Sequence, residues 1–169
     1  MNILRVCLIR KGTKHMTKHK FKPFLKRNKL SYDVVFTMSC LYGSGKINGM
    51  GVNTLFGLNY GWKTLHNTSF GWRPTDSGRI QIYAVQYCKS HKKEEKLCEL
   101  EVDLYYNMTI RTNNESSIFS VFDSNGLVVA YKKFKTTKNI NFGYESSLEL
   151  SELNIAPHDI YVFMRRQDK

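Results

Sequence analysis

Aromatic, cationic and amide side chains gather between positions 60 and 87 of this 169-residue chain. Two similar four-residue units, Tyr60-Gly61-Trp62-Lys63 and Phe70-Gly71-Trp72-Arg73, lie ten positions apart and contain both tryptophans. The segment RIQIYAVQYC (79–88) follows them. Rings combined with guanidinium and amide donors suit two ligand classes: a sugar, with its ring faces and hydroxyls, or a nucleotide, with its base and phosphates.

Alternation along extended strands divides these side chains between two faces. Phe70 and Trp72 would point toward a core, and Arg73 would point away from it. We therefore predict a ligand-binding face with no catalytic residue. Its predicted residues are Lys63, His66, Asn67, Arg73, Arg79, Gln81, Tyr83 and Tyr87. The alternative is an ordinary solvated sheet face, on which tyrosine and arginine are common.

The elements that must position this face are β-strands. Runs rich in β-branched and aromatic residues alternate with turn signals such as Pro74 to Gly78 and Ser124-Asn125-Gly126. The charged segment KSHKKEEK (89–96) is predicted to be a hairpin loop before a strand at 97–104. Eight or more short strands, with no convincing amphipathic helix, predict an all-β protein built as an antiparallel β-sandwich. A closed barrel is the alternative.

Positive charge is concentrated near the N-terminus. The formal net charge is +12, and residues 1–30 hold ten of the 26 Lys and Arg residues and no acid. We predict a basic N-terminal arm over 1–30, which need not be fully ordered, and a single β-sandwich domain over 31–169. Such an arm could contact nucleic acid, an anionic surface or an acidic partner, or it could simply be solvated.

The sequence lacks the motifs that are typical of several catalytic, metal and nucleotide sites. GSGKING (43–49) does not fit a phosphate-binding loop, and no metalloprotease, serine hydrolase or dinucleotide motif occurs. The four cysteines lack metal-ligand spacing, and we expect free thiols in a reducing compartment. We therefore expect no metal, no cofactor and no enzymatic activity. No apolar run is long enough to cross a bilayer, so we expect no membrane insertion.

Segments spread from residue 19 to the C-terminus resemble a group of uncharacterised, lectin-like proteins from Bacteroidota and their phages. They are HKFKPF (19–24), SCLY (39–42), NTLFGLNYGW (53–62), LHNTSFGWRP (65–74), GRIQIYAVQY (78–87) and APHDIYVF (156–163). The resemblance implies a concanavalin-like, jelly-roll type of sandwich. The group's typical spelling has two histidines where Leu65-His66 stands, which puts a role for a histidine pair in doubt. Together with the lack of a signal peptide, the resemblance implies a phage-encoded protein in the cytoplasm of a bacterial host, or in the virion.

Three functions are compatible with these features. The first is a non-enzymatic protein that sequesters a small anionic ligand, such as a nucleotide immune signal, as an anti-defence sponge. The second is a carbohydrate-binding or virion-associated lectin-like module. The third is a glycan-cleaving enzyme, which needs two carboxylates facing each other roughly 5–10 Å apart. The expected partner is a nucleotide or a glycan, and the sequence is compatible with a homo-oligomer.

Overall fold

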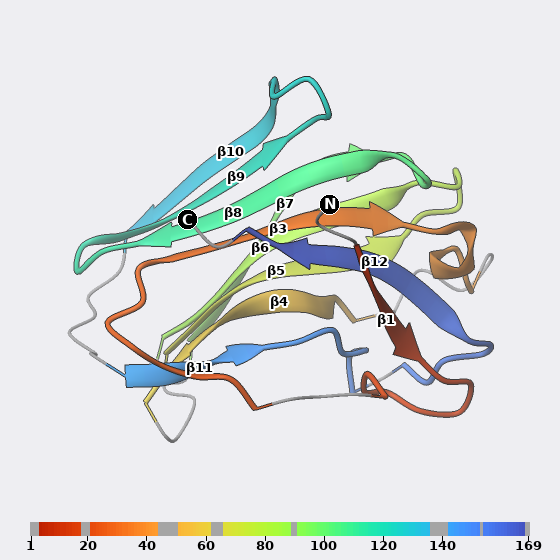
Figure 1. Cartoon of the computed structure of the whole chain (residues 1–169), viewed down its shortest axis with the longest axis horizontal. Helices are drawn as coiled ribbons and strands as arrows, with labels where there is room; N and C mark the ends of the chain where they lie inside the picture. The colour runs from red at the N-terminus through yellow and green to blue at the C-terminus, as the bar shows by residue number, and fades with distance from the viewer. Residues whose placement is uncertain are drawn as a thin grey trace.

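The chain folds into two antiparallel six-stranded sheets packed face to face as a β-sandwich (Figure 1). The computed structural model describes residues 4–17, 21–43, 51–61, 66–88, 91–135, 142–152 and 154–167. The sandwich predicted from the strand pattern is confirmed, and the closed barrel is not the architecture. Across these ranges no helix is both long and apolar enough to span a bilayer.

The two layers, called sheet A and sheet B, exchange the chain repeatedly, so neither is a separate unit. Sheet A contains, in spatial order, β1 (Arg5–Ile9), β12 (Ile160–Arg166), β3 (Lys29–Phe36), β8 (Tyr105–Thr112), β9 (Ser116–Phe122) and β10 (Val128–Lys135). Sheet B contains β2 (Pro23–Leu25), β11 (Phe142–Ser146), β4 (Asn53–Tyr60), β5 (His66–Pro74), β6 (Ile80–Cys88) and β7 (His91–Leu100). A short 3₁₀ turn, η1 (Met38–Cys40), follows β3.

Inward-facing side chains of both sheets meet in one apolar core. Phe70 and Trp72 of β5 are 0% exposed, so the prediction that they belong to the core is confirmed. The Trp72 ring lies 5.6 Å from that of Phe36, and the Phe70 ring lies 5.2 Å from that of Phe119. Both partners belong to sheet A, so these tilted and edge-on ring contacts join the layers. Trp62 lies outside the described residues.

The first 30 residues supply an edge strand to each sheet. β1 pairs with β12, and β2 pairs with β11. Ile9 is completely buried and Phe24 is 7% exposed, while neighbouring cations such as Arg5 and Lys22 are exposed. Short apolar stretches between the cations therefore anchor this region. The described part of the predicted basic arm is built into the sandwich.

The charged segment after β6 differs from its prediction. It was predicted to be a loop, but His91 begins a strand that pairs with β6 along its length and ends at Leu100. An edge strand tolerates charge, because one of its sides faces solvent. Here the cost is offset further by an ion pair between Glu95 and Lys132 of β10. The chain then turns through Asp103, whose φ is +59°, so the strand predicted at 97–104 is interrupted.

Two turns named from the sequence join strands as predicted. Gly78, between β5 and β6, has a φ of +75°, and Gly126, between β9 and β10, has a φ of +80°. Residues other than glycine rarely adopt this backbone conformation. The Asp123 carboxylate oxygen Oδ1 accepts hydrogen bonds from the backbone N–H groups of Asn125 and Leu127, each at 2.9 Å. The β9–β10 hairpin is thereby fixed in register.

The His158 side chain and the cysteine thiols have structural roles. The Nε2 atom of His158 lies 2.8 Å from the carbonyl oxygen of Ser39. All four cysteines are free thiols. Burial raises the pKa of Cys40 to about 12, so this thiol is protonated and unreactive at neutral pH.

Candidate ligand-binding face

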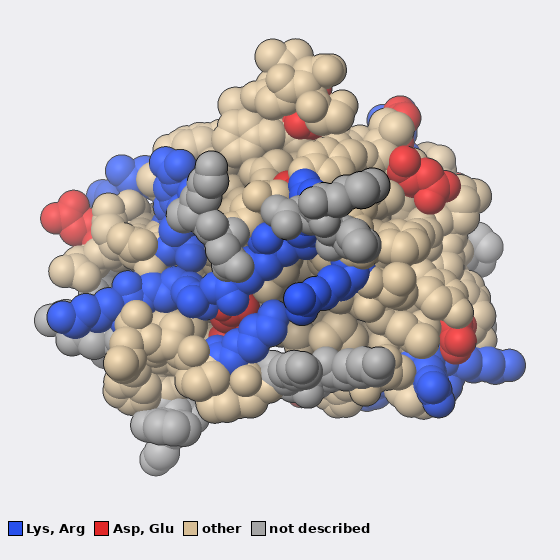
Figure 2. Space-filling model, in the orientation of Figure 1, with Lys and Arg blue, Asp and Glu red and all other residues tan. Residues whose placement is uncertain are grey.

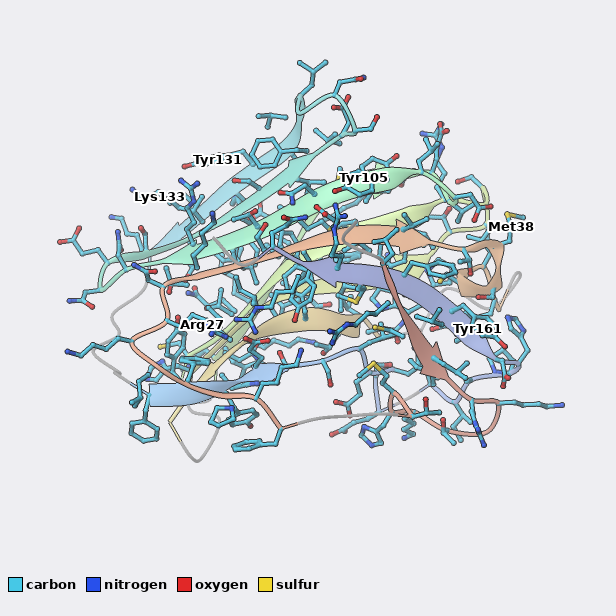
Figure 3. All side chains as sticks on the ribbon, in the orientation of Figure 1. Arg27, Met38, Tyr105, Tyr131, Lys133 and Tyr161 are labelled. Atoms are coloured by element: carbon cyan, nitrogen blue, oxygen red, sulfur yellow. The ribbon has the colours of Figure 1, made fainter. Side chains whose placement is uncertain are left out.

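A row of hydroxyl groups crosses the outer face of sheet A. Residues directly opposite in antiparallel strands point to the same face, and Ser31 lies opposite Thr109, which lies opposite Ser120. Their neighbour Ile110 points the other way and is fully buried. Tyr131 of β10 continues the row and is 59% exposed (Figure 3). The hydroxyl oxygens of Ser31 and Thr109 lie 2.7 Å apart, so the row is internally hydrogen-bonded.

A hollow of about 370 Å³ lies over this row and is called the sheet A hollow. It is lined by Lys29, Ser31, Asn107, Thr109, Arg111, Ser120, Phe122 and Gln167. The lining combines hydroxyl and amide groups, which can donate and accept hydrogen bonds, with two cations and one aromatic ring. Small-molecule sites usually enclose about 300–1,000 Å³. The hollow is therefore large enough for a small ligand.

Cations face one another at one end of the hollow. Lys29 lies directly opposite Arg111, which is followed across β9 by Ile118 and then by Lys133 of β10. Like charges directly opposite each other destabilise a sheet. Within the described ranges, no acidic side chain forms an ion pair with Arg111 or Lys133. An anion bound in the hollow would offset this repulsion.

Asp33 holds the floor of the hollow from the same face. It is 1% exposed, and its Oδ1 accepts a hydrogen bond from Nδ2 of Asn107 at 2.8 Å. Its Oδ2 accepts bonds from Nε and Nη2 of Arg165, at 2.9 and 2.6 Å, and from Nε2 of Gln167. Asp33 therefore orients two amides that line the hollow.

The same contacts fix the charge of Asp33. Burial alone would raise its pKa. Hydrogen bonds from Tyr105, Asn107, Arg165 and Gln167 outweigh burial and hold the pKa below its ordinary value. The carboxyl is therefore ionised at neutral pH and fully engaged, which does not suit a general acid.

A second charged cluster closes one opening between the sheets. Glu145 of β11 is 4% exposed and is surrounded by three cations. Its Oε1 contacts Nη1 of Arg27 and lies 3.0 Å from Nη2 of Arg166, and its Oε2 lies 3.8 Å from Nζ of Lys22. The hydroxyl of Tyr32 donates to Oε2 at 3.2 Å. We call Lys22, Arg27 and Arg166 the cationic mouth.

Most of the ligand residues predicted from the sequence lie on the other side of the molecule. The outer face of sheet B carries five of them, which register brings together: Asn67, Arg73, Gln81, Tyr83 and Tyr87. His66 lies opposite Tyr60, whose ring is buried in the core, and so belongs to the inner face. Arg79 lies before β6 and forms an ion pair with Glu101 at 3.1 Å. Lys63 lies outside the described residues.

The side chains on the sheet B face bind one another. Gln81 Oε1 accepts hydrogen bonds from Nε of Arg73 and from the Tyr83 hydroxyl, both at 2.8 Å. The Arg73 guanidinium lies 5.2 Å from the centre of the Tyr83 ring. Gln81 donates to Glu99 at 3.1 Å, and Lys96 lies 2.6 Å from the same carboxylate. This network leaves Arg73 less available to a ligand.

The residues that line the sheet A hollow are not among the ligand residues predicted from the sequence, although the sequence contains a signal for them. Alternation over 105–112 places Tyr106, Met108 and Ile110 on one face, and all three are buried. The same alternation places Asn107, Thr109 and Arg111 together on the opposite face.

Comparison with solved structures identifies the type of fold. A functionally unknown protein from Saccharomyces cerevisiae gives a TM-score of 0.58 at 6% identity, covering 97% of this chain and 87% of that protein. A xylan beta-1,4-xylosidase from Bacillus Halodurans C-125 gives 0.52 at 8% identity, covering 92% of this chain and 29% of the enzyme. SCLam, a non-specific endo-beta-1,3(4)-glucanase from family GH16, gives 0.50 at 11% identity, covering 85% and 59%.

These likenesses show a jelly-roll or concanavalin-like β-sandwich that carbohydrate-active proteins share. The chain spans less than two thirds of the length of both enzymes, and also of the Scytalido-glutamic peptidases that it matches. Neither the family models nor the curated proteins give a match. The relation to Bacteroidota phages and the location in host or virion stay predictions.

Proposed function

We propose that the protein is a non-enzymatic binding protein that holds an anionic saccharide in the sheet A hollow. One observation supports this most directly: the cross-strand row in which Lys29 faces Arg111, with Lys133 beyond. Like charges directly opposite each other cost stability in a sheet, and a bound carboxylate or sulfate beside Arg111 would reduce that cost. The anion-binding function expected from the sequence is kept, but at a different face.

The side chains beside these cations favour a sugar as the uncharged part of the ligand. Hydroxyls and amides from Ser31, Asn107, Thr109 and Ser120 can both donate to and accept from sugar hydroxyls. Phe122 lines the hollow, and the exposed ring of Tyr131 stands at the end of the hydroxyl row. Aromatic faces pack well against the apolar face of a sugar ring. The fold shared with xylan- and glucan-acting proteins agrees with this choice.

Binding without catalysis is supported by the carboxylates. Glycoside cleavage needs two of them around the scissile bond. None of the eight lining residues that the structure describes is acidic. Asp33, directly beneath, is buried and holds Asn107, Arg165 and Gln167. Its engagement leaves it unsuited to act as acid or nucleophile.

A nucleotide is the second candidate. The gathering of positive charge beside the hydroxyl row, with the ring of Tyr131 at its end, would suit a phosphate and a stacked base. Both candidate ligands carry a negatively charged group. They differ in the rest of the ligand, which is a nucleoside in one case and a saccharide in the other. The sequestering of a nucleotide immune signal therefore stays a hypothesis that the same experiment tests.

Calorimetric titration with matched ligands tests the proposal. Digalacturonate should bind, and neutral galactobiose should bind at least tenfold more weakly. Arg111→Gln should lower the affinity for digalacturonate about tenfold, or about 1.4 kcal/mol. Arg73→Gln, the matched control on sheet B, should leave the affinity unchanged.

Three results would overturn the proposal. No binding of any anionic saccharide would reject it. Tighter binding of ATP, ADP-ribose or a cyclic dinucleotide would replace the saccharide with a nucleotide. Loss of binding in Arg73→Gln, with none in Arg111→Gln, would move the site to the face originally predicted.

A further inference from the structure

We infer that the ligand of the sheet A hollow is amphipathic: an anionic saccharide that carries an apolar group at one end. This inference rests on the proposed function and extends it to a second part of the same ligand. The saccharide would occupy the hollow, and the apolar group would lie on a neighbouring part of the same outer face. The ligand class is then a glycoconjugate, such as an alkyl or aryl glycoside of a sugar acid.

An apolar row crosses the outer face of sheet A beside the hollow. It consists of Val6, Phe163, Val35 and Tyr105, each directly opposite the next in neighbouring strands and therefore on the same face. Val34, next to Val35 in the chain, is fully buried, so the row points away from the core. Val6 is 54% exposed, and the other three are partly exposed. We call these four residues the apolar row.

A further pair of side chains extends this apolar surface. Leu8 of β1 lies directly opposite Tyr161 of β12, at the next outward positions of the two strands. Tyr161 is 38% exposed, and Leu8 is partly exposed. The outward face of an antiparallel sheet is usually polar, and adjoining exposed apolar side chains often mark a binding surface. This part of sheet A therefore departs from an ordinary solvated face.

The apolar row borders the hollow directly. Tyr105 stands two residues before Asn107 on β8, and side chains two residues apart on a strand are neighbours on one face. Asn107 lines the hollow. The Tyr105 hydroxyl accepts a hydrogen bond from Nη2 of Arg165 at 3.3 Å, and the same guanidinium holds Asp33 beneath the hollow. A ligand group that leaves the hollow along β8 therefore meets the apolar row.

Polarity changes in order along the strands. The outward side chains of β8 are, from its end to its start, Arg111, Thr109, Asn107 and Tyr105. They pass from a cation through a hydroxyl and an amide to an aromatic ring. At about 3.4 Å per residue, the step from Arg111 to Tyr105 is about 20 Å. A disaccharide covers only part of this path, so an elongated ligand would place a further group on the apolar row.

Charged side chains are unevenly spread in the same direction. Figure 2 shows Lys and Arg side chains in rows over the left and centre of the view, whereas charged groups on the right are scattered. In Figure 3, Lys133 lies toward the left, and Tyr105 and Tyr161 lie farther to the right. An amphipathic ligand aligned with the strands would match this distribution, with its anion at the cationic end.

The experiment compares the methyl, butyl and octyl glycosides of digalacturonate on the full chain, by calorimetric titration below their micelle concentrations. Affinity should rise at least tenfold from the methyl to the octyl glycoside, because alkyl carbon is removed from water. Val35→Thr should lower this gain about threefold, because it replaces one methyl group of the apolar row with a hydroxyl. The methyl glycoside should bind this variant as it binds the native protein, which reports that the variant is folded.

Two controls isolate the apolar row and the charge. Val85→Thr makes the same substitution on the outer face of sheet B and should keep the full gain with alkyl length. Octyl galactobioside, which lacks the carboxylates, should bind at least tenfold more weakly than octyl digalacturonate. Equal binding of the two octyl glycosides would mean that the alkyl group binds without an anion, which would overturn the inference.

The remaining outcomes separate this inference from the proposed function. Binding of the methyl glycoside with no gain for the octyl glycoside would overturn the apolar group and leave the hollow in place. An undiminished gain in Val35→Thr would place the alkyl group away from the apolar row and would also overturn the inference. No binding of any digalacturonate would reject the proposed function itself. Tighter binding to phosphatidylglycerol vesicles than to octyl digalacturonate would replace the glycoconjugate with a lipid surface.

Discussion

The two outer faces of the sandwich use similar side chains in opposite ways. On sheet B, Arg73 is hydrogen-bonded to Gln81 and lies over the Tyr83 ring. On sheet A, Arg111 lies directly opposite Lys29 beside a row of hydroxyls. The first face engages its arginine with neighbouring side chains, whereas the second places two cations opposite each other, where an anionic ligand could neutralise them. Residue type alone therefore does not mark a ligand site, and the partners of each side chain decide between the two faces.

The largest expected effect comes from removing the charge beneath the hollow. Asp33→Asn should lower the free energy of unfolding by about 3 kcal/mol, because it breaks a buried ion pair with Arg165 and disturbs the donors around it. Denaturation with urea measures this. Glu99→Gln, at the exposed edge of sheet B, should have a much smaller effect. Equal losses in the two variants would show that the two networks do not differ as proposed.

A smaller effect should appear as a dependence on pH. The folded-state pKa of Asp33 is lowered from its ordinary value of 3.8, so its ionisation stabilises the fold above that value. This contribution should be lost as pH falls from about 4 through the lower folded-state pKa. The difference in stability between the native protein and Asp33→Asn should therefore shrink in acid. A difference that stays constant from pH 7 to pH 2 would contradict this origin.

The fold could be predicted from the sequence because alternation is a local signal. Alternation over 160–166 places Ile160, Val162 and Met164 on one face, and all three are buried. β7 could not be predicted in this way. Its charges are tolerated only because it is an edge strand whose Glu95 meets Lys132 of β10. That pairing joins residues far apart in the sequence and exists only in the folded sandwich.

The candidate site shows the same limit more strongly. Asn107, Thr109 and Arg111 could be placed on one face from the sequence. That Ser31 and Lys29 would lie directly opposite them depends on which strands become neighbours. The internal partners of Arg73 likewise depend on the register between β5 and β6. Strand order and register are properties of the whole fold, so a single sequence does not reveal them.

Tyrosines on the two faces offer a comparison of intermediate size. Tyr131→Ala should weaken binding of digalacturonate about tenfold, or by about 1.4 kcal/mol, since the ring stands exposed beside the hydroxyl row, where it could pack against a sugar ring. Tyr87→Ala is the matched control, because Tyr87 is also exposed but lies on sheet B. Calorimetric titration of both variants measures the difference. A greater loss in Tyr87→Ala would favour the sheet B face.

The smallest effect would test the contrast between the faces without any ligand. Arg111→Gln should raise the stability of the free protein by about 0.5 kcal/mol, because it removes repulsion from Lys29. Arg73→Gln should lower stability by about 1 kcal/mol, because it breaks a hydrogen bond from a charged group to Gln81. Urea denaturation at low salt measures both.

High salt separates repulsion from other causes of the gain in Arg111→Gln. Exposed charges are screened within about 3 Å at 1 M salt, so a gain due to repulsion should largely vanish there. The loss in Arg73→Gln should persist, because a direct hydrogen bond depends less on screening. A loss of stability in both variants at low salt would mean that Arg111 has a stabilising role in the free protein. Contacts within the free protein would then balance the charge of Arg111. The main reason to expect an anion in the sheet A hollow would be lost.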